Sequence, residues 1–136
     1  MEREQIDLSI YRMEKAKNDL ETSGENLQKN RISQSINRSY YAMFHAARAV
    51  LALDKLDSRK HSGVIAFFNQ NYIKTGKIER EFFRMLADAF DIRKQSDYND
   101  FYIAVREDAQ IQLENARKFL KRTHEYIKDV IREEER

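Results

Sequence analysis

The sequence predicts an all-α protein, an up-and-down bundle of about five helices. The chain of 136 residues has no proline and only three glycines, whereas a sheet protein needs turn residues after every few strands. Apolar residues make up 41% of the chain and recur at helical spacing. The length fits one domain, which we expect to span residues 4–132, with residues 133–136 as a fraying tail.

The composition also excludes several classes of site. Cysteine is absent, so there is no disulfide and no thiolate nucleophile or metal site, which fits a cytoplasmic protein. No apolar run approaches the ~20 residues that a membrane span needs. The metal-binding patterns His-Glu-x-x-His and Glu-x-x-His are both missing, so we expect neither metal nor cofactor. The net charge of +2 argues against a broad duplex-binding surface but permits a local basic cleft.

The first helix is expected from about Ile6 to Leu20, with Gly24 as its C-terminal cap. The second is expected from about Asn30 to Leu53. It carries an apolar face, an alanine face and a polar-aromatic face. A helix that uses three faces is expected to lie at the centre of the bundle.

A third helix is expected from about Arg59 to Lys74, capped by Asp57 or Ser58. A fourth is expected from about Ile78 to Lys94.

The cap-forming residues Ser96–Asp100 then predict a loop. The last helix is expected from about Ala104 to Ile131. Its apolar residues alternate at spacings of four and three, which predicts a narrow packing seam.

The polar-aromatic face of the second helix is the first candidate site. It carries Arg38, Tyr41, His45 and Arg48, where a solvated face would carry lysine, glutamate and glutamine. Such a row can bind anions, stack on bases or contact another protein. His45 could be a general base near neutral pH, or it could hydrogen-bond a neighbouring helix.

Arg93 occupies a position where the apolar stripe of the fourth helix predicts a core residue. A buried guanidinium needs a partner, and Asp97 is four residues away. The two could form a structural ion pair, or Asp97 could orient an arginine that binds phosphate. Lys60 and His61, at the start of the third helix, offer a second anion-binding position or a solvated first turn.

Together, the segments Arg38–Leu51, Arg59–Ile65 and Arg93–Tyr98 resemble, in this order and spacing, the HEPN family of higher eukaryotes and prokaryotes nucleotide-binding domains. The resemblance is to the small stand-alone prokaryotic branch and covers nearly the whole chain. It implies a helical bundle that forms a homodimer. It also implies a toxin–antitoxin pair whose other member is a minimal nucleotidyltransferase.

Many members of that family are metal-independent ribonucleases, in which an arginine at a helix end is followed, after a short stretch, by a histidine. Arg93 matches the arginine, but Tyr98 stands at the histidine position, and no histidine occurs between His61 and His124. We therefore expect binding of RNA or a nucleotide rather than efficient cleavage. If cleavage occurs, the catalytic candidates are Arg93, Asp97 and His45.

The residues around Arg93 supply binding and modification candidates. The residues expected to bind the ligand around Arg93 are Arg38, Tyr41, Tyr98, Lys60 and His61. In some of these systems the nucleotidyltransferase adenylylates a tyrosine near the motif, which suggests Tyr98 or Tyr102. The alternative is a non-catalytic interaction protein, in which the polar helix face forms the dimer or partner interface and the Arg93–Asp97 pair is structural.

Overall fold

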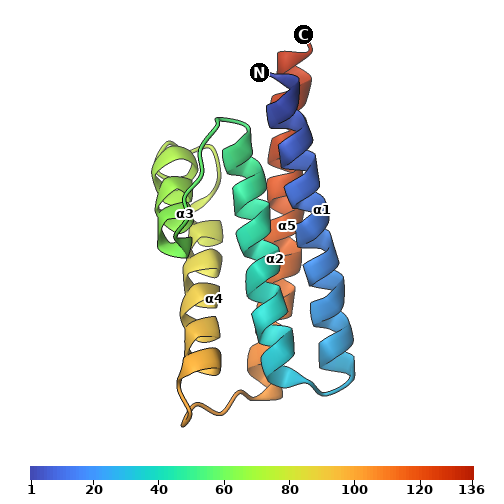
Figure 1. The fold of residues 1–136 in the computed structure, drawn as a ribbon, viewed down its shortest axis with the longest axis vertical. Helices are drawn as coiled ribbons and strands as arrows, with labels where there is room; N and C mark the ends of the chain where they lie inside the picture. Colours follow the sequence, from blue (N-terminus) through green and yellow to red (C-terminus); the bar gives the residue numbers. More distant parts are fainter.

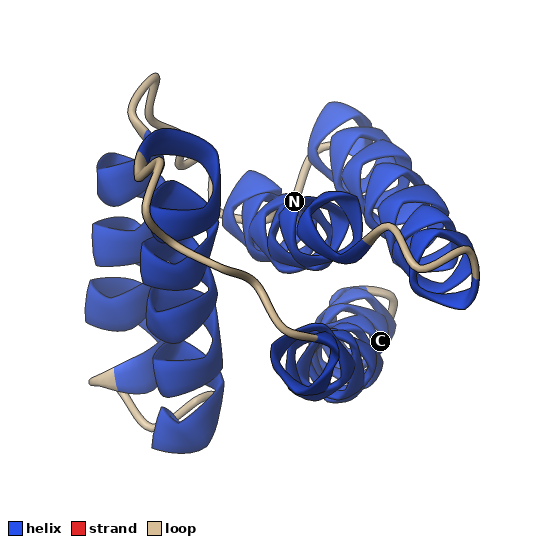
Figure 2. Cartoon of the chain, turned by 90° about the horizontal axis from the view of Figure 1, so that it is seen from below, coloured by secondary structure: helices blue, strands red, loops and turns tan.

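The computed structural model describes all 136 residues and contains helices but no strand (Figure 2). The predicted all-α bundle is therefore confirmed. Figure 1 shows α1, α2 and α5 running side by side, with α3 and α4 on the other side of α2. Both chain termini lie at the same end. The helices are α1 (Arg3–Gln28), α2 (Ile32–Ala52), α3 (His61–Phe68) with the π-helical turn η1 (Asn69–Ile73), α4 (Arg80–Tyr98) and α5 (Arg106–Glu134).

The central position predicted for the second helix is confirmed. Helix α2 contacts all four other α-helices, and 13 of its 21 residues are buried. Its alanine face includes Ala42, Ala46 and Ala49, all fully buried, because small side chains let neighbouring helices approach closely. Most of α2 is therefore core or contact with a neighbouring helix, and its exposed residues Ser33 and Gln34 lie in the first turn.

Helix α1 is longer than predicted, and the predicted end at Gly24 is wrong. The helix continues to Gln28 because its last turns pack on α2. There the buried Ser23 Oγ lies 2.8 Å from the Ser35 carbonyl oxygen, to which it donates. The left-handed conformation expected of Gly24 is instead adopted by Asn30, with φ 60°.

The third predicted helix is shorter and differently capped. It begins at His61 rather than Arg59, and neither Asp57 nor Ser58 is its N-cap, which is Lys60. The segment after Phe68 is wound as the π-helical turn η1. These differences arise because the residues before His61 are held by contacts with α1 and α2, described below.

The predicted loop at Ser96–Asp100 is wrong over its first half. Helix α4 continues through Asp97 to Tyr98, because Asp97 is held there by Arg93, one turn earlier, and by Asn37 of α2. A turn closed by the hydrogen bond from the Tyr102 amide to the Asn99 carbonyl follows, then an irregular segment to Val105, and α5 begins at Arg106.

The packing seam predicted for the last helix is confirmed. Its buried residues include every member of the seam up to Ile127. These are Ala109, Leu113, Ala116, Leu120, Thr123 and Ile127.

None of the helices has the combination of length and apolar character that a membrane crossing requires.

Candidate functional site

Arg93 lies on the α4 face that packs against α2, surrounded by tyrosines. Its guanidinium carbon is 5.7, 5.4 and 5.5 Å from the ring centroids of Tyr40, Tyr41 and Tyr98. Its Nη2 donates a hydrogen bond to the Tyr41 hydroxyl at 3.2 Å. The side chain is 15% exposed. Aromatic faces attract a cation, so the three rings stabilise the charge that α4 brings into this partly buried position.

Asp97 is the ionic partner that the sequence predicts for Arg93. Asp97 Oδ2 lies 3.0 Å from Arg93 Nε. The Nε–H does not point at that oxygen, so the buried Nε makes no hydrogen bond, and the contact is best described as an ion pair. Asp97 Oδ2 also accepts a hydrogen bond from Asn37 Nδ2 at 3.2 Å. The carboxylate thus links α4 to α2.

The polar contacts continue from Asn37 to α1. Asn37 Oδ1 accepts hydrogen bonds from Arg38 Nη2 at 2.7 Å and Nε at 3.0 Å. Arg38 Nη1 donates to Asp19 Oδ1 at 3.0 Å. A chain of polar contacts therefore joins α1, α2 and α4. Beside it lies an open cavity of about 530 Å³ that is lined by polar residues only: Asn26, Arg31, Ser33, Gln34, Asn37, Arg38 and Asp97.

His45 lies at the α1 side of this chain and is largely shielded from solvent. Its Nε2 is 3.7 Å from Asp19 Oδ2, its side chain is 13% exposed, and its Nδ1 is buried without a partner. Burial, followed by the charges of Lys15, Arg48 and Arg38, lowers the pKa of His45 to about 4. The imidazole is therefore neutral at pH 7. Its ring reaches Arg93 only through the intervening Tyr41 ring, 5.9 Å away.

His61 is not the freely solvated side chain that one of the two alternatives describes. Its Nδ1 lies 2.7 Å from the Tyr40 hydroxyl, and its ring stacks on Phe44 with centroids 4.2 Å apart. Burial, then the charges of Arg93 and Arg48, lower the pKa of His61. The two helices α2 and α3 thus hold the imidazole in one orientation.

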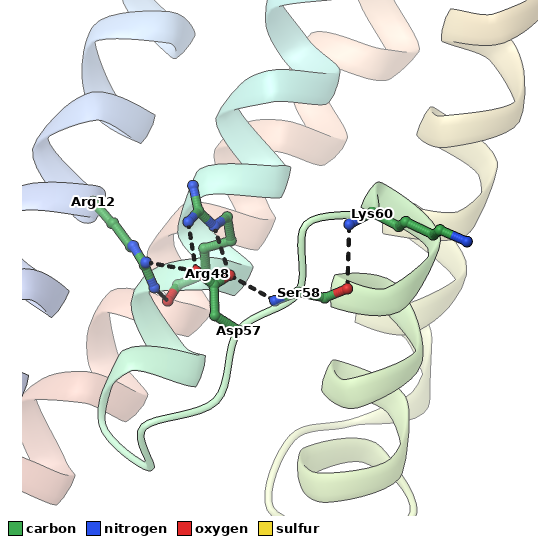
Figure 3. A network of polar contacts seen from close by, with 5 residues as sticks. All are labelled: Arg12, Arg48, Asp57, Ser58 and Lys60. Atoms are coloured by element: carbon green, nitrogen blue, oxygen red, sulfur yellow. Dashed lines mark hydrogen bonds and ion pairs between the residues drawn. The ribbon is translucent and has the colours of Figure 1, made fainter.

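A second polar cluster fixes the loop that leads to His61 (Figure 3). Asp57 Oδ2 accepts hydrogen bonds from Arg48 Nη2 at 2.9 Å and Arg12 Nη2 at 3.1 Å. Asp57 Oδ1 accepts one from the Ser58 amide at 2.8 Å, and Ser58 Oγ accepts one from the Lys60 amide at 3.2 Å. The Lys60 side chain points away from this cluster.

Gly63 completes this arrangement, because a Cβ there would overlap the Ser58 Oγ and lie 2.8 Å from the Ser58 Cβ. The loop can approach the first turn of α3 only because residue 63 has no side chain. The position of His61 is therefore set by the contacts of its ring with α2 and by the loop that precedes α3.

The structure brings together most of the predicted site residues. Tyr41 and Tyr98 contact Arg93 directly, and Arg38 stacks on Tyr41, with its guanidinium carbon 4.7 Å from the ring centroid. Tyr102 is not among the tyrosines around Arg93, and its hydroxyl donates to Asp108 Oδ2 at 3.4 Å.

Three participants were missed by the sequence analysis. Tyr40 lies on the apolar stripe of α2 and looks like a core residue. Its hydroxyl could have been flagged, because a buried tyrosine needs a hydrogen-bond partner. Asn37 and Asp19 carry no signal in the sequence, since only the packing of three helices brings them into contact with Arg38 and Asp97.

The stretch after α4 exposes apolar side chains beside this site. Tyr98 is 72%, Phe101 94% and Ile103 81% exposed, and Val105 is also exposed. Single exposed apolar residues are ordinary, but four within eight positions mark a surface that can be covered by a partner.

The fold and the site define a helical-bundle protein with an arginine-centred polar cluster between α2 and α4. A family model described as the HEPN domain matches residues 10–126. The chain belongs to the HEPN domain family, which confirms the resemblance seen in the sequence.

Curated relatives are consistent with this assignment. The chain is 33% identical over 116 residues to "Putative toxin MJ0142" of Methanocaldococcus jannaschii, covering 85% of this chain and 78% of that protein. It is 34% identical over 106 residues to a "UPF0332 protein" of Thermotoga maritima, covering 78% and 80%. It is 30% identical over 97 residues to "Putative toxin MJ0605" of Methanocaldococcus jannaschii, covering 71% and 72%.

Proposed function

We propose that this protein is the RNA- or nucleotide-binding toxin component of a toxin–antitoxin pair whose other member is a minimal nucleotidyltransferase. Membership of the HEPN family and the names of two relatives support this class of system. The observation that carries the binding site is the environment of Arg93, a cation oriented by tyrosines at the edge of the bundle.

Arg93 has a donor available for a ligand. Nη2 is bonded to Tyr41 and Nε is buried against Asp97, whereas Nη1 makes no hydrogen bond within the chain and is not buried. A phosphate oxygen can therefore accept a hydrogen bond from Nη1 without breaking an existing contact. In this proposal Asp97 and the tyrosines hold the guanidinium in place, and Arg38 and the polar cavity beside Asp97 extend the binding surface along the ligand.

The proposed active form is a homodimer. The exposed apolar stretch from Tyr98 to Val105 directly follows the helix that carries Arg93. In a symmetric dimer this stretch would meet its own copy, so two Arg93 side chains would face one shared cleft. A specific interface of this kind buries at least ~1,000 Å².

The experiment is a titration of fluorescent single-stranded RNA with wild-type protein, Arg93→Ala and the control Arg117→Ala. Arg117 is an exposed arginine on α5 that pairs with Glu114 at 3.5 Å. Its replacement by alanine changes the net charge by the same amount as Arg93→Ala but leaves the site around Arg93 intact. We expect Arg93→Ala to weaken binding by at least ~10-fold, since it removes a charge-assisted hydrogen bond, and Arg117→Ala to bind nearly as wild type.

A second candidate function is a non-catalytic interaction protein, and the Arg93–Asp97 ion pair favours it. Under that function Arg93→Ala would lower the melting temperature in circular dichroism and leave RNA binding intact. The same two variants, measured on one preparation, separate the two functions.

A further inference from the structure

We propose that His61 is the general base of an RNA-cleaving centre built within one protomer, with Tyr40 as its positioning residue and Arg93 as the group that stabilises charge. The proposal rests on the proposed RNA binding at Arg93. It supplies from α3 the histidine that is missing after Arg93 on α4.

His61 and Arg93 lie against the same two rings. The guanidinium carbon of Arg93 is 5.7 Å from the Tyr40 ring centroid and 5.4 Å from that of Tyr41. The His61 ring centroid is 5.8 Å and 5.7 Å from the same two centroids. His61 and Arg93 therefore contact the same two rings, although 32 positions separate them in sequence, and the charge of Arg93 acts on His61.

The orientation of the His61 ring is suited to a base. The Tyr40 hydroxyl lies 2.7 Å from Nδ1 and can accept or donate a hydrogen bond. In the proposed tautomer Nδ1–H donates to the Tyr40 oxygen and the lone pair is on Nε2. Nε2 has no partner within the chain and is not buried. Stacking on Phe44 holds the plane of the ring, and the close approach of Ser58 to Gly63 holds the first turn of α3, where His61 lies. A second group that holds the imidazole in one orientation is the usual requirement for a histidine base.

The charges around His61 favour an anionic substrate. Arg93 and Arg48 both act on it electrostatically and Lys60 precedes it. Lys94 lies 4.5 Å from the centroid of Phe90, whose ring is 6.4 Å from that of His61. The carboxylates in this region, Asp57 and Asp97, are already paired with Arg48 and Arg93. Burial, followed by the charges of Arg93 and Arg48, lowers the pKa of His61 and so favours the neutral imidazole, the form that can accept a proton.

His45 is less suited to the same role. Its side chain is only 13% exposed, its Nδ1 is enclosed, and its Nε2 lies 3.7 Å from Asp19 Oδ2. Burial and the charges of Lys15, Arg48 and Arg38 lower the pKa of His45 to about 4, which makes it a weak base. His61 therefore replaces His45 as the expected base.

The reaction is a transesterification within the RNA. His61 Nε2 takes the proton of a ribose 2′-hydroxyl while the 2′-oxygen forms a bond to phosphorus and the bond from phosphorus to the 5′-oxygen breaks. The 5′-oxygen leaves with the electron pair and takes a proton from water, and the proton on His61 returns to solvent. Arg93 Nη1 donates to a non-bridging oxygen as charge develops on it. The products are a 2′,3′-cyclic phosphate and a 5′-hydroxyl, and no further reactant is consumed.

The experiment compares wild type, His61→Ala, Tyr40→Phe and the control His124→Gln, a histidine on α5, using total RNA in excess EDTA. We expect cyclic-phosphate ends from wild type, a loss of about 10²–10⁴-fold in His61→Ala, partial rescue of that variant by added imidazole, and near-normal cleavage by His124→Gln. Tyr40→Phe should lower kcat about 10-fold with little change in KM and should alter the pH profile, since neutral residues that orient a base act on proton transfer.

Mixing the two defective proteins tests whether the centre lies in one protomer. If His61 and Arg93 act together within a protomer, a mixture of His61→Ala and Arg93→Ala stays inactive. If they act across a dimer, mixed dimers contain one intact site and activity returns. Return of activity would overturn the single-protomer centre.

Two other outcomes reject the proposal while leaving the proposed function standing. One is Arg93-dependent RNA binding with no cleavage of any RNA by wild type. The other is full cleavage by folded His61→Ala. Absence of Arg93-dependent binding would instead reject the proposed function.

Discussion

Arg12 donates a hydrogen bond from Nη2 to Asp57 Oδ2 at 3.1 Å, across 45 positions of sequence. The Arg12 side chain is buried, and its Nη1 donates to the Arg48 carbonyl oxygen at 3.0 Å. Asp57 is thus the acceptor that makes a buried guanidinium tolerable between α1 and α2. Because Asp57 also accepts from the Ser58 amide, the same contact anchors the loop before His61.

Replacing Asp57 by asparagine is expected to destabilise the bundle, because it leaves the Arg12 and Arg48 charges without their anion. We expect a loss of about 1–2 kcal/mol, the usual size for a broken charge-assisted contact that is partly solvated. The measurement is urea unfolding followed by circular dichroism. The control is Asp7→Asn, whose partner Arg3 is exposed, and it should change stability by less than ~0.5 kcal/mol. Equal stability of the two variants would contradict an anchoring role for Asp57.

The environment of His45 predicts a loss of stability in mild acid. Burial, followed by neighbouring cations, lowers the pKa of His45 from 6.5 to about 4. Between these two values the unfolded chain binds a proton that the folded chain does not, so stability falls as the pH falls from 7 to 4. The contribution of this one group between pH 7 and 5 is on the order of 2 kcal/mol.

The measurement is urea unfolding at pH 7, 6 and 5 for wild type and His45→Gln. Asp19, Lys15, Arg38 and Arg48 face His45 and are present in both proteins. The difference in the free energy of unfolding between the two proteins therefore reports the titration of His45. We expect the curve of the variant to be flatter by roughly 2 kcal/mol over this range. Parallel curves would mean that His45 titrates normally in the folded protein.

The sequence predicts those parts of the fold in which the residues of a single helix carry the whole signal. The seam of α5, with Leu113 and Leu120 buried at a spacing of seven, is visible from periodicity alone. The extension of α1 beyond Gly24 is not, because the buried hydrogen bond from Ser23 to Ser35 depends on how α2 packs.

The same distinction holds for the candidate site. Arg93 was conspicuous as a charge on an apolar stripe, and Asp97 was the obvious partner at four residues. Tyr40 and His61 belong to different helices, and the contact between them follows from the loop that Asp57 anchors. No spacing along the chain encodes that contact, so the sequence alone could not select His61 over His45.

Tyr98 is expected to be the tyrosine that a partner nucleotidyltransferase adenylylates. Its side chain is exposed and its hydroxyl makes no hydrogen bond within the chain, whereas the Tyr102 hydroxyl donates to Asp108 and burial raises the pKa of Tyr102. With the purified partner and ATP, intact-mass measurement should show adenylylated wild type and Tyr102→Phe but unmodified Tyr98→Phe. Modification that survives in Tyr98→Phe would assign the reaction to another residue.

The exposed stretch after α4 predicts how the proposed homodimer can be disrupted. Phe101 is 94% exposed, and burying a phenylalanine side chain stabilises an interface by about 1.5–3 kcal/mol. A two-fold interface contains this contact twice, so Phe101→Ser should raise the dimer dissociation constant at least ~100-fold. Sedimentation velocity over a range of concentrations measures this dissociation constant.

The matched control is Tyr11→Ser, which replaces an aromatic residue exposed on α1, and it should leave association unchanged. A dimer weakened by Tyr11→Ser but not by Phe101→Ser would place the interface elsewhere. A wild-type protein that is monomeric at all concentrations would mean that there is no such interface. Without it the two Arg93 side chains would not share a cleft, and the RNA site would consist of one protomer's residues alone.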